Sequence, residues 1–138
     1  MRAFKTVLFL LTITVSGVVF ARTPEPVVNL YDQPVVAASG KTLSVDDVKQ
    51  LITKVAHEKN WVVTPAGDRK LNASLSWNGN KHTIVVSIAY ETDRYSVTYK
   101  DSINMKYEVS DGKAVIHPYY NRYVSGLREA IRVELLRL

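Results

Sequence analysis

The sequence predicts an α+β protein in which two helices pack on one face of a three- to four-stranded antiparallel meander, in the order helix, strands, helix. Apolar residues recur at three- and four-residue spacing in the segments 45–56 and 120–138, which is the period of an amphipathic helix. Between these segments, apolar and polar residues alternate in runs separated by turn sequences, as in strands with one buried face. Strands joined by such short turns pair antiparallel, and both helices bury their apolar stripes on the sheet.

The first 21 residues have the layout of a bacterial signal peptide. Arg2 and Lys5 precede an apolar run at residues 7–20, and Ala21 supplies a small residue at the cleavage position. A membrane-spanning helix needs about 20 apolar residues, so this run is short for one. We therefore predict cleavage after Ala21 and a protein of the periplasm or the secreted fraction, without a stable membrane anchor. The alternative is that the same segment stays as an uncleaved anchor.

The remaining residues, 22–138, have the length of a single domain with a modest core. The whole chain carries a net charge of +5; the predicted signal peptide accounts for two positive charges and no negative ones, so residues 22–138 carry +3. This mild excess favours approach to anionic surfaces such as envelope glycolipids, without specifying a partner. The chain has no cysteine, which excludes disulfides, thiolate metal sites, a cysteine nucleophile and a lipid-bearing cysteine.

Residues 22–42 are predicted to form an extended, proline-containing leader ahead of a single α+β domain at residues 43–138. Pro24, Pro26 and Pro34 interrupt any regular structure in this leader. One interpretation is that residues 27–31 or 35–37 add an edge strand, because proline is tolerated at a sheet edge. The other is a mobile linker.

The first helix has a clear start signal. Ser44 is a predicted N-cap, and Asp47 three residues later completes a variant of the capping box. Leu43 can pack on Val48 as a hydrophobic staple. The predicted buried stripe follows at helical spacing: Val45, Val48, Leu51, Ile52, Val55 and Ala56. Asn60 is the expected stop.

Three strands are predicted after this helix, at residues 71–77, 82–90 and 94–100, and residues 61–63 form a possible fourth. Asn78 and Gly79 predict a tight hairpin turn, and residues 91–93 make the next turn. Residues 82–90 are apolar on one face and partly so on the other, which predicts a central strand covered on both sides. Residues 101–115 are predicted as a strand and a turn.

The last helix is predicted to open near Pro118 and to run to the C-terminus, because proline suits a first helical turn. Its predicted buried stripe comprises Tyr120, Val124, Leu127, Ile131, Leu135 and Leu138. Its predicted water-facing residues are Arg122, Arg128, Glu129, Arg132 and Glu134. Gly126 interrupts this helix, and a close approach to the sheet would explain it.

No metal, cofactor or catalytic pattern is present in the sequence, so we predict a protein that is not an enzyme and binds no cofactor. The three histidines lie in different predicted elements, away from metal-pair spacing: His57, His82 and His117. His57 is expected near the end of the first helix, and His117 is expected to cap the last helix. The closest carboxylates bracket the second turn and the strand after it: Glu91, Asp93 and Asp101. A small hydrolase using these acids with a histidine is the least favoured alternative.

Tyrosine is the most distinctive residue type of the second half of the chain. Tyr95, Tyr99 and Tyr120 fall on apolar faces and are predicted to be core. Tyr119 and Tyr123 are predicted to be exposed. With Arg122 they share one side of the last helix, since residues three and four apart are neighbours there. These three residues are the predicted binding site, because tyrosine and arginine together are typical of binding faces.

The segments 95–105 and 116–124 resemble a family of small proteobacterial envelope proteins of unassigned function, many of which are regarded as lipoproteins. The most specific part is the pattern Ile-His-x-x-Tyr-Asn-x-aromatic-Val at residues 116–124, and the likeness spans about residues 44–136. This chain departs from the family in lacking the lipid-bearing cysteine. The resemblance implies an envelope location and a compact α+β domain, and it brings no catalytic residues.

The sequence therefore predicts a non-catalytic exported envelope protein that binds a protein or glycan partner, and not nucleic acid. A structural or antigenic component that self-associates through an exposed strand edge is the alternative from another class. The ligand itself is not specified by any residue pattern.

Overall fold

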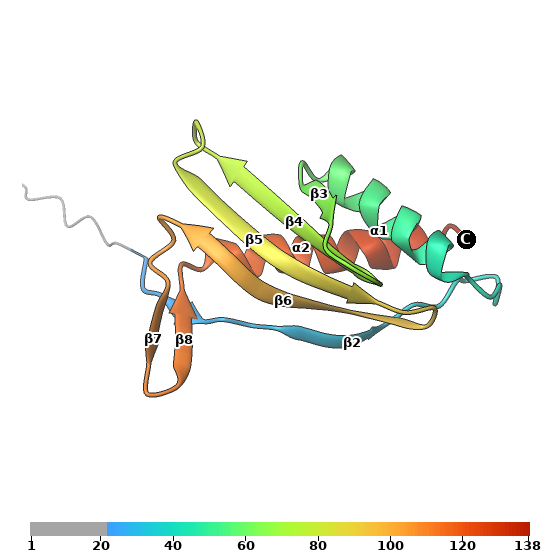
Figure 1. Cartoon of the computed structure of the whole chain (residues 1–138), viewed down its shortest axis with the longest axis horizontal. Coiled ribbons are helices and arrows are strands. Elements are labelled where there is room, and N and C mark those ends of the chain that lie inside the picture. Colours follow the sequence, from blue (N-terminus) through green and yellow to red (C-terminus); the bar gives the residue numbers. More distant parts are fainter. Residues whose placement is uncertain (1–21) are drawn as a thin grey trace, which may run out of the picture.

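The computed structural model describes residues 22–138, so the predicted signal peptide lies outside the described residues. Two helices and eight strands make up the described part, which confirms the α+β class (Figure 1). In chain order they are β1 (Glu25–Pro26), β2 (Leu30–Pro34), α1 (Val45–Glu58), β3 (Val62–Pro65), β4 (Lys70–Trp77), β5 (His82–Tyr90), β6 (Arg94–Ile103), β7 (Glu108–Ser110), β8 (Lys113–Ile116) and α2 (Tyr119–Leu135).

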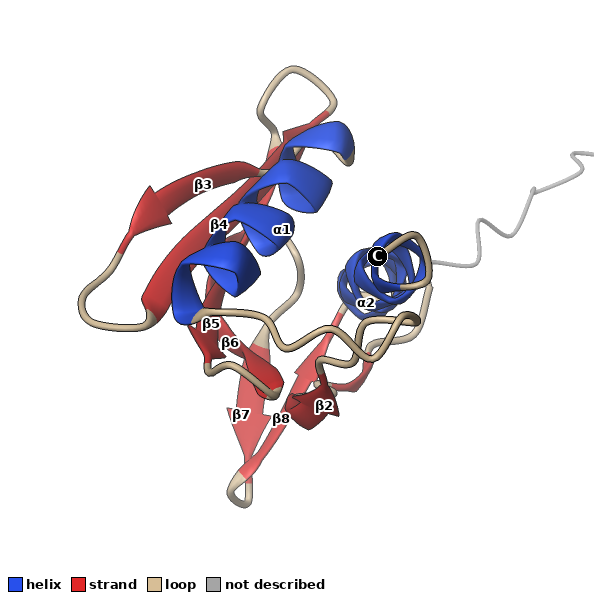
Figure 2. Cartoon of the chain, turned by 90° about the vertical axis from the view of Figure 1, so that its right-hand side faces the viewer, coloured by secondary structure: helices blue, strands red, loops and turns tan. Residues whose placement is uncertain are grey.

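The strands form two antiparallel sheets. The larger sheet has five strands in the order β2-β6-β5-β4-β3, and the smaller has three in the order β1-β8-β7. Both helices lie on the same face of the five-stranded sheet, as Figure 2 shows nearly end-on for α2. The β7–β8 hairpin extends away from the larger sheet (Figure 1).

The predicted order helix, strands, helix is wrong, and the sheets are larger than predicted. Strands β1 and β2 precede α1, because residues 22–42 are not a separate leader but supply one strand to each sheet. β2 is an edge strand paired with β6 through Leu30 and Val97, and Pro34 ends it. The edge-strand interpretation is therefore confirmed, although the strand covers residues 30–34. Asp32 has a φ of 47° at the irregular point of this pairing.

The predicted start of α1 is confirmed in detail. The Ser44 hydroxyl accepts a hydrogen bond from the Asp47 amide at 3.0 Å, and the Asp47 carboxylate accepts one from the Ser44 amide at 2.9 Å. Leu43 and Val48 are both buried. The helix ends at Glu58, and Asn60 adopts the left-handed conformation with a φ of 68°.

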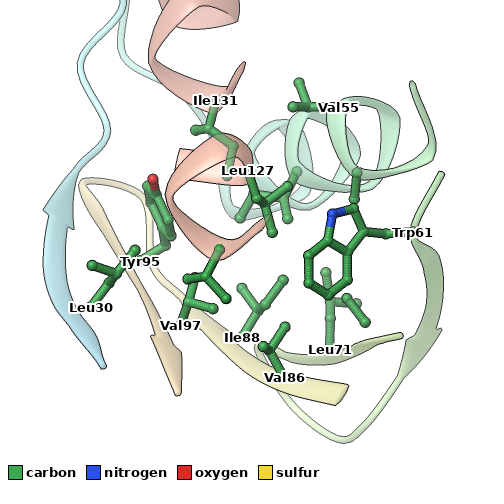
Figure 3. Close-up of a cluster of buried hydrophobic side chains, with 14 of the residues drawn as sticks. Leu30, Val55, Trp61, Leu71, Val86, Ile88, Tyr95, Val97, Leu127 and Ile131 are labelled. Carbon is green, nitrogen blue, oxygen red and sulfur yellow. The ribbon is translucent and has the colours of Figure 1, made fainter. Parts of the chain in front are cut away.

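The core lies between the helices and the sheet (Figure 3). Inward side chains of β4, β5 and β6, such as Leu71, Ile88 and Val97, are almost fully buried. In Figure 3, Ile88 and Val97 lie below Leu127 of α2, and Leu71 lies beside Trp61. Each such side chain contributes about 1.5–3 kcal/mol on removal from water. Burial of these side chains between the two helices and the sheet thus stabilises the fold.

The opposite face of the five-stranded sheet is not covered. Thr83, Val85 and Ser87 of β5 are half-buried and Ala89 is exposed, so the predicted cover on both sides of this strand is wrong. The reason is that both helices occupy the same face (Figure 2). The serine and threonine residues of β4 and β5 remain in contact with water on this face.

The predicted tight turn at Asn78 and Gly79 is also longer than expected. Trp77 pairs with His82, so four residues connect β4 to β5. Asn78, Gly79 and Asn80 all have positive φ angles, between 55° and 63°. Asparagine and glycine adopt this conformation at the lowest cost, which explains why the loop is built from them.

Helix α2 begins after Pro118, as predicted, and its stripe is buried as far as Leu135. Leu138 is 41% exposed because the helix has already ended. Glu134 does not face water, since its carboxylate accepts a hydrogen bond from the Lys54 ammonium of α1 at 2.6 Å. Gly126 has open space where a Cβ would lie, so the predicted close approach to the sheet is wrong.

Candidate functional site

The beginning of α2 lies beside the end of β4, the start of β5 and the first described residues of the chain. We call the side chains that meet there the α2 entrance cluster: Arg22, Trp77, His82, His117, Tyr119, Arg122 and Tyr123. The elements that carry them converge at the left of Figure 1.

Asn121, in the first turn of α2, ties residues 25–28 to the cluster. Its amide nitrogen donates to the Glu25 carboxylate at 2.9 Å and to the Pro26 carbonyl at 2.8 Å. Its amide oxygen accepts from the Val28 amide at 3.0 Å. Because β1 also pairs with β8, the chain just after Arg22 is held on two sides.

The aromatic rings of the cluster form one continuous series. His82 stacks on Trp77 with centroids 5.4 Å apart, and Trp77 meets Tyr123 at 4.9 Å. Tyr123 contacts Tyr119 edge-on at 6.2 Å, and Tyr119 meets His117 at 4.6 Å. Such pairs contribute about 0.5–1.5 kcal/mol each beyond their burial, so the series fixes the position of its members.

Two guanidinium groups lie over the ring of Tyr119. The Arg22 guanidinium carbon is 4.6 Å from the ring centroid and that of Arg122 is 5.3 Å away, both within the range of cation–π attraction. Neither arginine forms an ion pair with any residue in the range 22–138. The tyrosine ring thus orients two cations that lack a partner in the described part of the chain.

His117 connects the ring series to the helix. Its Nδ1 accepts a hydrogen bond from the Tyr119 amide at 3.1 Å, so the side chain bonds the first turn much as predicted for a cap. Burial lowers the pKa of His117, and the charges of Arg22, Lys106 and His82 lower it further, whereas Glu25 opposes them. The neutral imidazole, with its proton on Nε2, is therefore the form that fits this site.

The structure brings the three predicted site residues together on one side of α2. Arg122 is exposed as predicted, but Tyr119 and Tyr123 are half-buried instead of exposed, because they pack on His117 and Trp77. The sequence prediction missed Arg22, Trp77 and His82. Trp77 and His82 end and begin two predicted strands, and the loop of four residues makes them direct cross-strand neighbours; the predicted tight turn would have paired Trp77 with Asn80 instead.

The tyrosines predicted to be core behave as such. Tyr95 and Tyr120 are buried, and Tyr99 is half-buried with its ring stacked on Tyr107 at 4.2 Å. Burial raises the pKa of Tyr95 to about 12. The hydroxyl of Tyr120 is buried and has no hydrogen-bond partner among the described residues.

The predicted acids do not gather around a histidine. Glu91 pairs with Arg69, where it lines a cleft of about 390 Å³, and Asp93 pairs with Arg94. His82 opens β5 and Glu91 follows its end, so the two residues are separated by nearly the length of the strand, roughly 30 Å. Asp101 lies near the end of β6, and its carboxylate accepts a hydrogen bond from the Ser102 amide.

Within residues 22–138, no group of three or more histidine or acidic side chains is arranged to hold a metal ion. No helix in that range has the length and apolar character needed to cross a membrane. Comparison of the chain with protein-family models, curated proteins and solved structures finds no match. The α+β fold and the geometry of the cluster are therefore the basis for assigning a function.

Proposed function

We propose that the protein is a non-catalytic binding module of the bacterial envelope, whose protein or glycan partner is captured by the α2 entrance cluster. Export is supported by the signal-peptide pattern of residues 1–21, and an envelope location by the resemblance of residues 95–105 and 116–124. Tryptophan, tyrosine and arginine are the residues that most often dominate binding energy at interfaces. The cluster combines all three types.

The pair of arginines over Tyr119 is the observation that carries this proposal. Elsewhere in the described range, Arg69, Arg94, Arg132 and Arg137 each pair with a carboxylate. Arg22 and Arg122 do not, although each is held against an aromatic ring. Cations that are positioned and yet unpaired are suited to an external partner.

Capture from envelope extract tests the proposal. The double variant Arg22→Ala/Arg122→Ala removes two exposed side chains, which costs stability only about 0.5 kcal/mol or less. We expect it to lose partner capture while its melting temperature stays close to that of the original protein. Arg128→Ala is the matched control, because Arg128 is also exposed on α2 and forms no ion pair with a described residue. Undiminished capture by the double variant would contradict the proposal.

Self-association is a second candidate, favoured by strand β7. β7 is the edge of the smaller sheet, all three of its residues are exposed, and Val109 is 57% exposed. An unpaired edge with an apolar side chain can pair with a second copy. Sedimentation velocity over a range of concentrations tests this: a dimer that Val109→Lys abolishes supports it, and a monomer throughout rejects it.

A further inference from the structure

The side chains of the α2 entrance cluster indicate which class of ligand it binds. This inference rests on the proposed function as a binding module. The cluster carries two cations, because Arg22 and Arg122 lie over Tyr119, and the charge of Lys106 is close enough to His117 to lower the pKa of that histidine. Glu25 is the acid that acts on the same histidine, and its carboxylate is engaged by Asn121. The local field is therefore positive and favours an anionic ligand.

The guanidinium groups define what kind of anion fits. A guanidinium group carries N–H donors in a planar, forked arrangement that can bind two oxygens of one ligand group. Carboxylates and phosphates match this fork geometry, and such charge-assisted pairs are about twice as strong as neutral hydrogen bonds. Two arginines on one ring are thus a preorganised holder for a carboxylate or a phosphate.

The aromatic residues define what the anion is attached to. The hydroxyls of Tyr119 and Tyr123 and the indole nitrogen of Trp77 make no hydrogen bond with residues 22–138. Their half-buried rings offer apolar surface beside these polar groups. A sugar ring has the complementary surface, because apolar C–H groups cover its faces and hydroxyls surround its edge.

The charge of the whole molecule separates this ligand from nucleic acid. Residues 22–138 carry a net charge of only +3, since residues 1–21 hold two of the five excess positive charges. A protein that follows a nucleic-acid backbone needs a longer row of cations, because several phosphates are neutralised at once. Here Arg22 and Arg122 meet over the single ring of Tyr119, which suits one anionic group of a ligand.

We infer that the α2 entrance cluster binds an acidic glycan, with a carboxylate or phosphate of the sugar chain held by Arg22 and Arg122 and the sugar in contact with Tyr119 and Tyr123. Trp77 and His117 hold the two tyrosines in place from either end of the ring series. The acid group supplies the affinity, and the tyrosine rings restrict the ligand to sugars that can lie beside them.

A matched pair of polysaccharides tests this inference. Polygalacturonate carries a carboxylate on every ring, and its fully methyl-esterified form has the same rings without the charge. We expect the purified full chain to bind polygalacturonate at least tenfold more tightly than the ester in calorimetric titration, with an affinity that falls as salt is added. Arg22→Ala and Arg122→Ala should each weaken binding at least tenfold. Arg122→Lys should weaken binding less, because lysine keeps the positive charge and loses only the paired N–H donors of the guanidinium group.

Three controls decide between the remaining explanations. Arg128→Ala should leave binding unchanged; an equal loss in Arg128→Ala and Arg122→Ala would mean diffuse charge attraction and would overturn the inference. Equal binding of the acid and the ester would reject the acidic ligand while leaving a binding module. Tighter binding of oligothymidylate than of polygalacturonate would reject a glycan. Failure of the proposed function is distinct, because envelope capture would then survive the loss of both Arg22 and Arg122.

Discussion

The Tyr120 hydroxyl is buried without a hydrogen-bond partner among the described residues, which lowers the stability of the folded protein. Its side chain is 0% exposed, and its ring meets Tyr99 edge-on at 5.6 Å. An unsatisfied buried hydroxyl costs about 1–3 kcal/mol. We therefore predict that Tyr120→Phe, which keeps the ring and removes the hydroxyl, raises the free energy of unfolding by about 1 kcal/mol in urea denaturation. A loss of stability would show that the hydroxyl has a partner in solution.

His117 gives a prediction about pH. Its pKa is lowered in the folded protein from the ordinary value of 6.5, so the unfolded chain binds a proton more readily than the folded one. The stabilisation is fully present above about pH 6.5 and is lost as the pH falls toward the lowered pKa. His117→Asn keeps an acceptor for the Tyr119 amide but does not titrate, so it should flatten the melting temperature between pH 7 and about pH 5. A slope equal to that of the original protein in His117→Asn would refute the assignment.

At the level of residues, sequence patterns located part of the candidate site. Helical spacing predicted that Tyr119, Arg122 and Tyr123 share a side, because neighbours on a helix are fixed by its period. Arg22 could not be predicted, since its position depends on hydrogen bonds that Asn121 makes to residues 25–28, nearly a hundred positions away in sequence. Tertiary contacts of that kind leave no local pattern.

The cap of α1 yields a prediction for an element. Ser44 and Asp47 satisfy each other's backbone amides, and burial of the stripe behind them depends on the helix starting at this point. Ser44→Ala should lower the free energy of unfolding by about 1 kcal/mol, the usual effect of removing such a cap. Ser125→Ala, at an exposed position inside α2, is the control and should not lower it. An unchanged denaturation midpoint for Ser44→Ala would mean that the helix starts elsewhere in solution.

Gly126 yields a second prediction, in α2. It lies inside the helix, its added Cβ would meet open space, and it has no positive φ that would require glycine. Gly126→Ala should therefore raise the free energy of unfolding by about 0.5–1 kcal/mol through helix propensity. Chemical denaturation of the original protein and of Gly126→Ala measures this difference. A lower denaturation midpoint for Gly126→Ala would mean that the added methyl group meets a neighbouring atom in solution.

The elements themselves were predictable where a long period repeats. β4, β5 and β6 alternate over seven or more residues, and α1 and α2 carry stripes of several turns, so their types and most of their buried positions were predicted correctly. The cover predicted for the second face of β5 and the burial predicted for Val45 were wrong. β1 and β2 have two and five residues and contain prolines, which is too short for a period to appear. Their pairing with β8 and β6 is decided by long-range contacts. The prediction therefore missed the sheet size, while most of the buried positions of the two helices were right.

On the scale of the whole molecule, residues 22–34 connect the two sheets to the candidate site. β1 pairs with β8, β2 pairs with β6, and the Asn121 side chain fixes the chain between them. Arg22 consequently lies over Tyr119, immediately after the predicted cleavage point. If the signal peptide is removed there, the new terminus adds an α-amino group to the cations of the α2 entrance cluster.

We therefore predict that the mature protein begins at Arg22 and that this processing strengthens the binding of anions. Mass spectrometry of a periplasmic extract should give the mass of residues 22–138, and the intact Met1 form in the membrane fraction would contradict cleavage. Processed protein should bind polygalacturonate more tightly than the same protein after selective acetylation of its α-amino group, which removes that charge. The α-amino group has a pKa of about 7.7–8.0, so this difference should shrink as the pH rises above about 8. Equal affinities below about pH 7 would show that the terminus lies outside the reach of the bound acid, even where cleavage itself is correct.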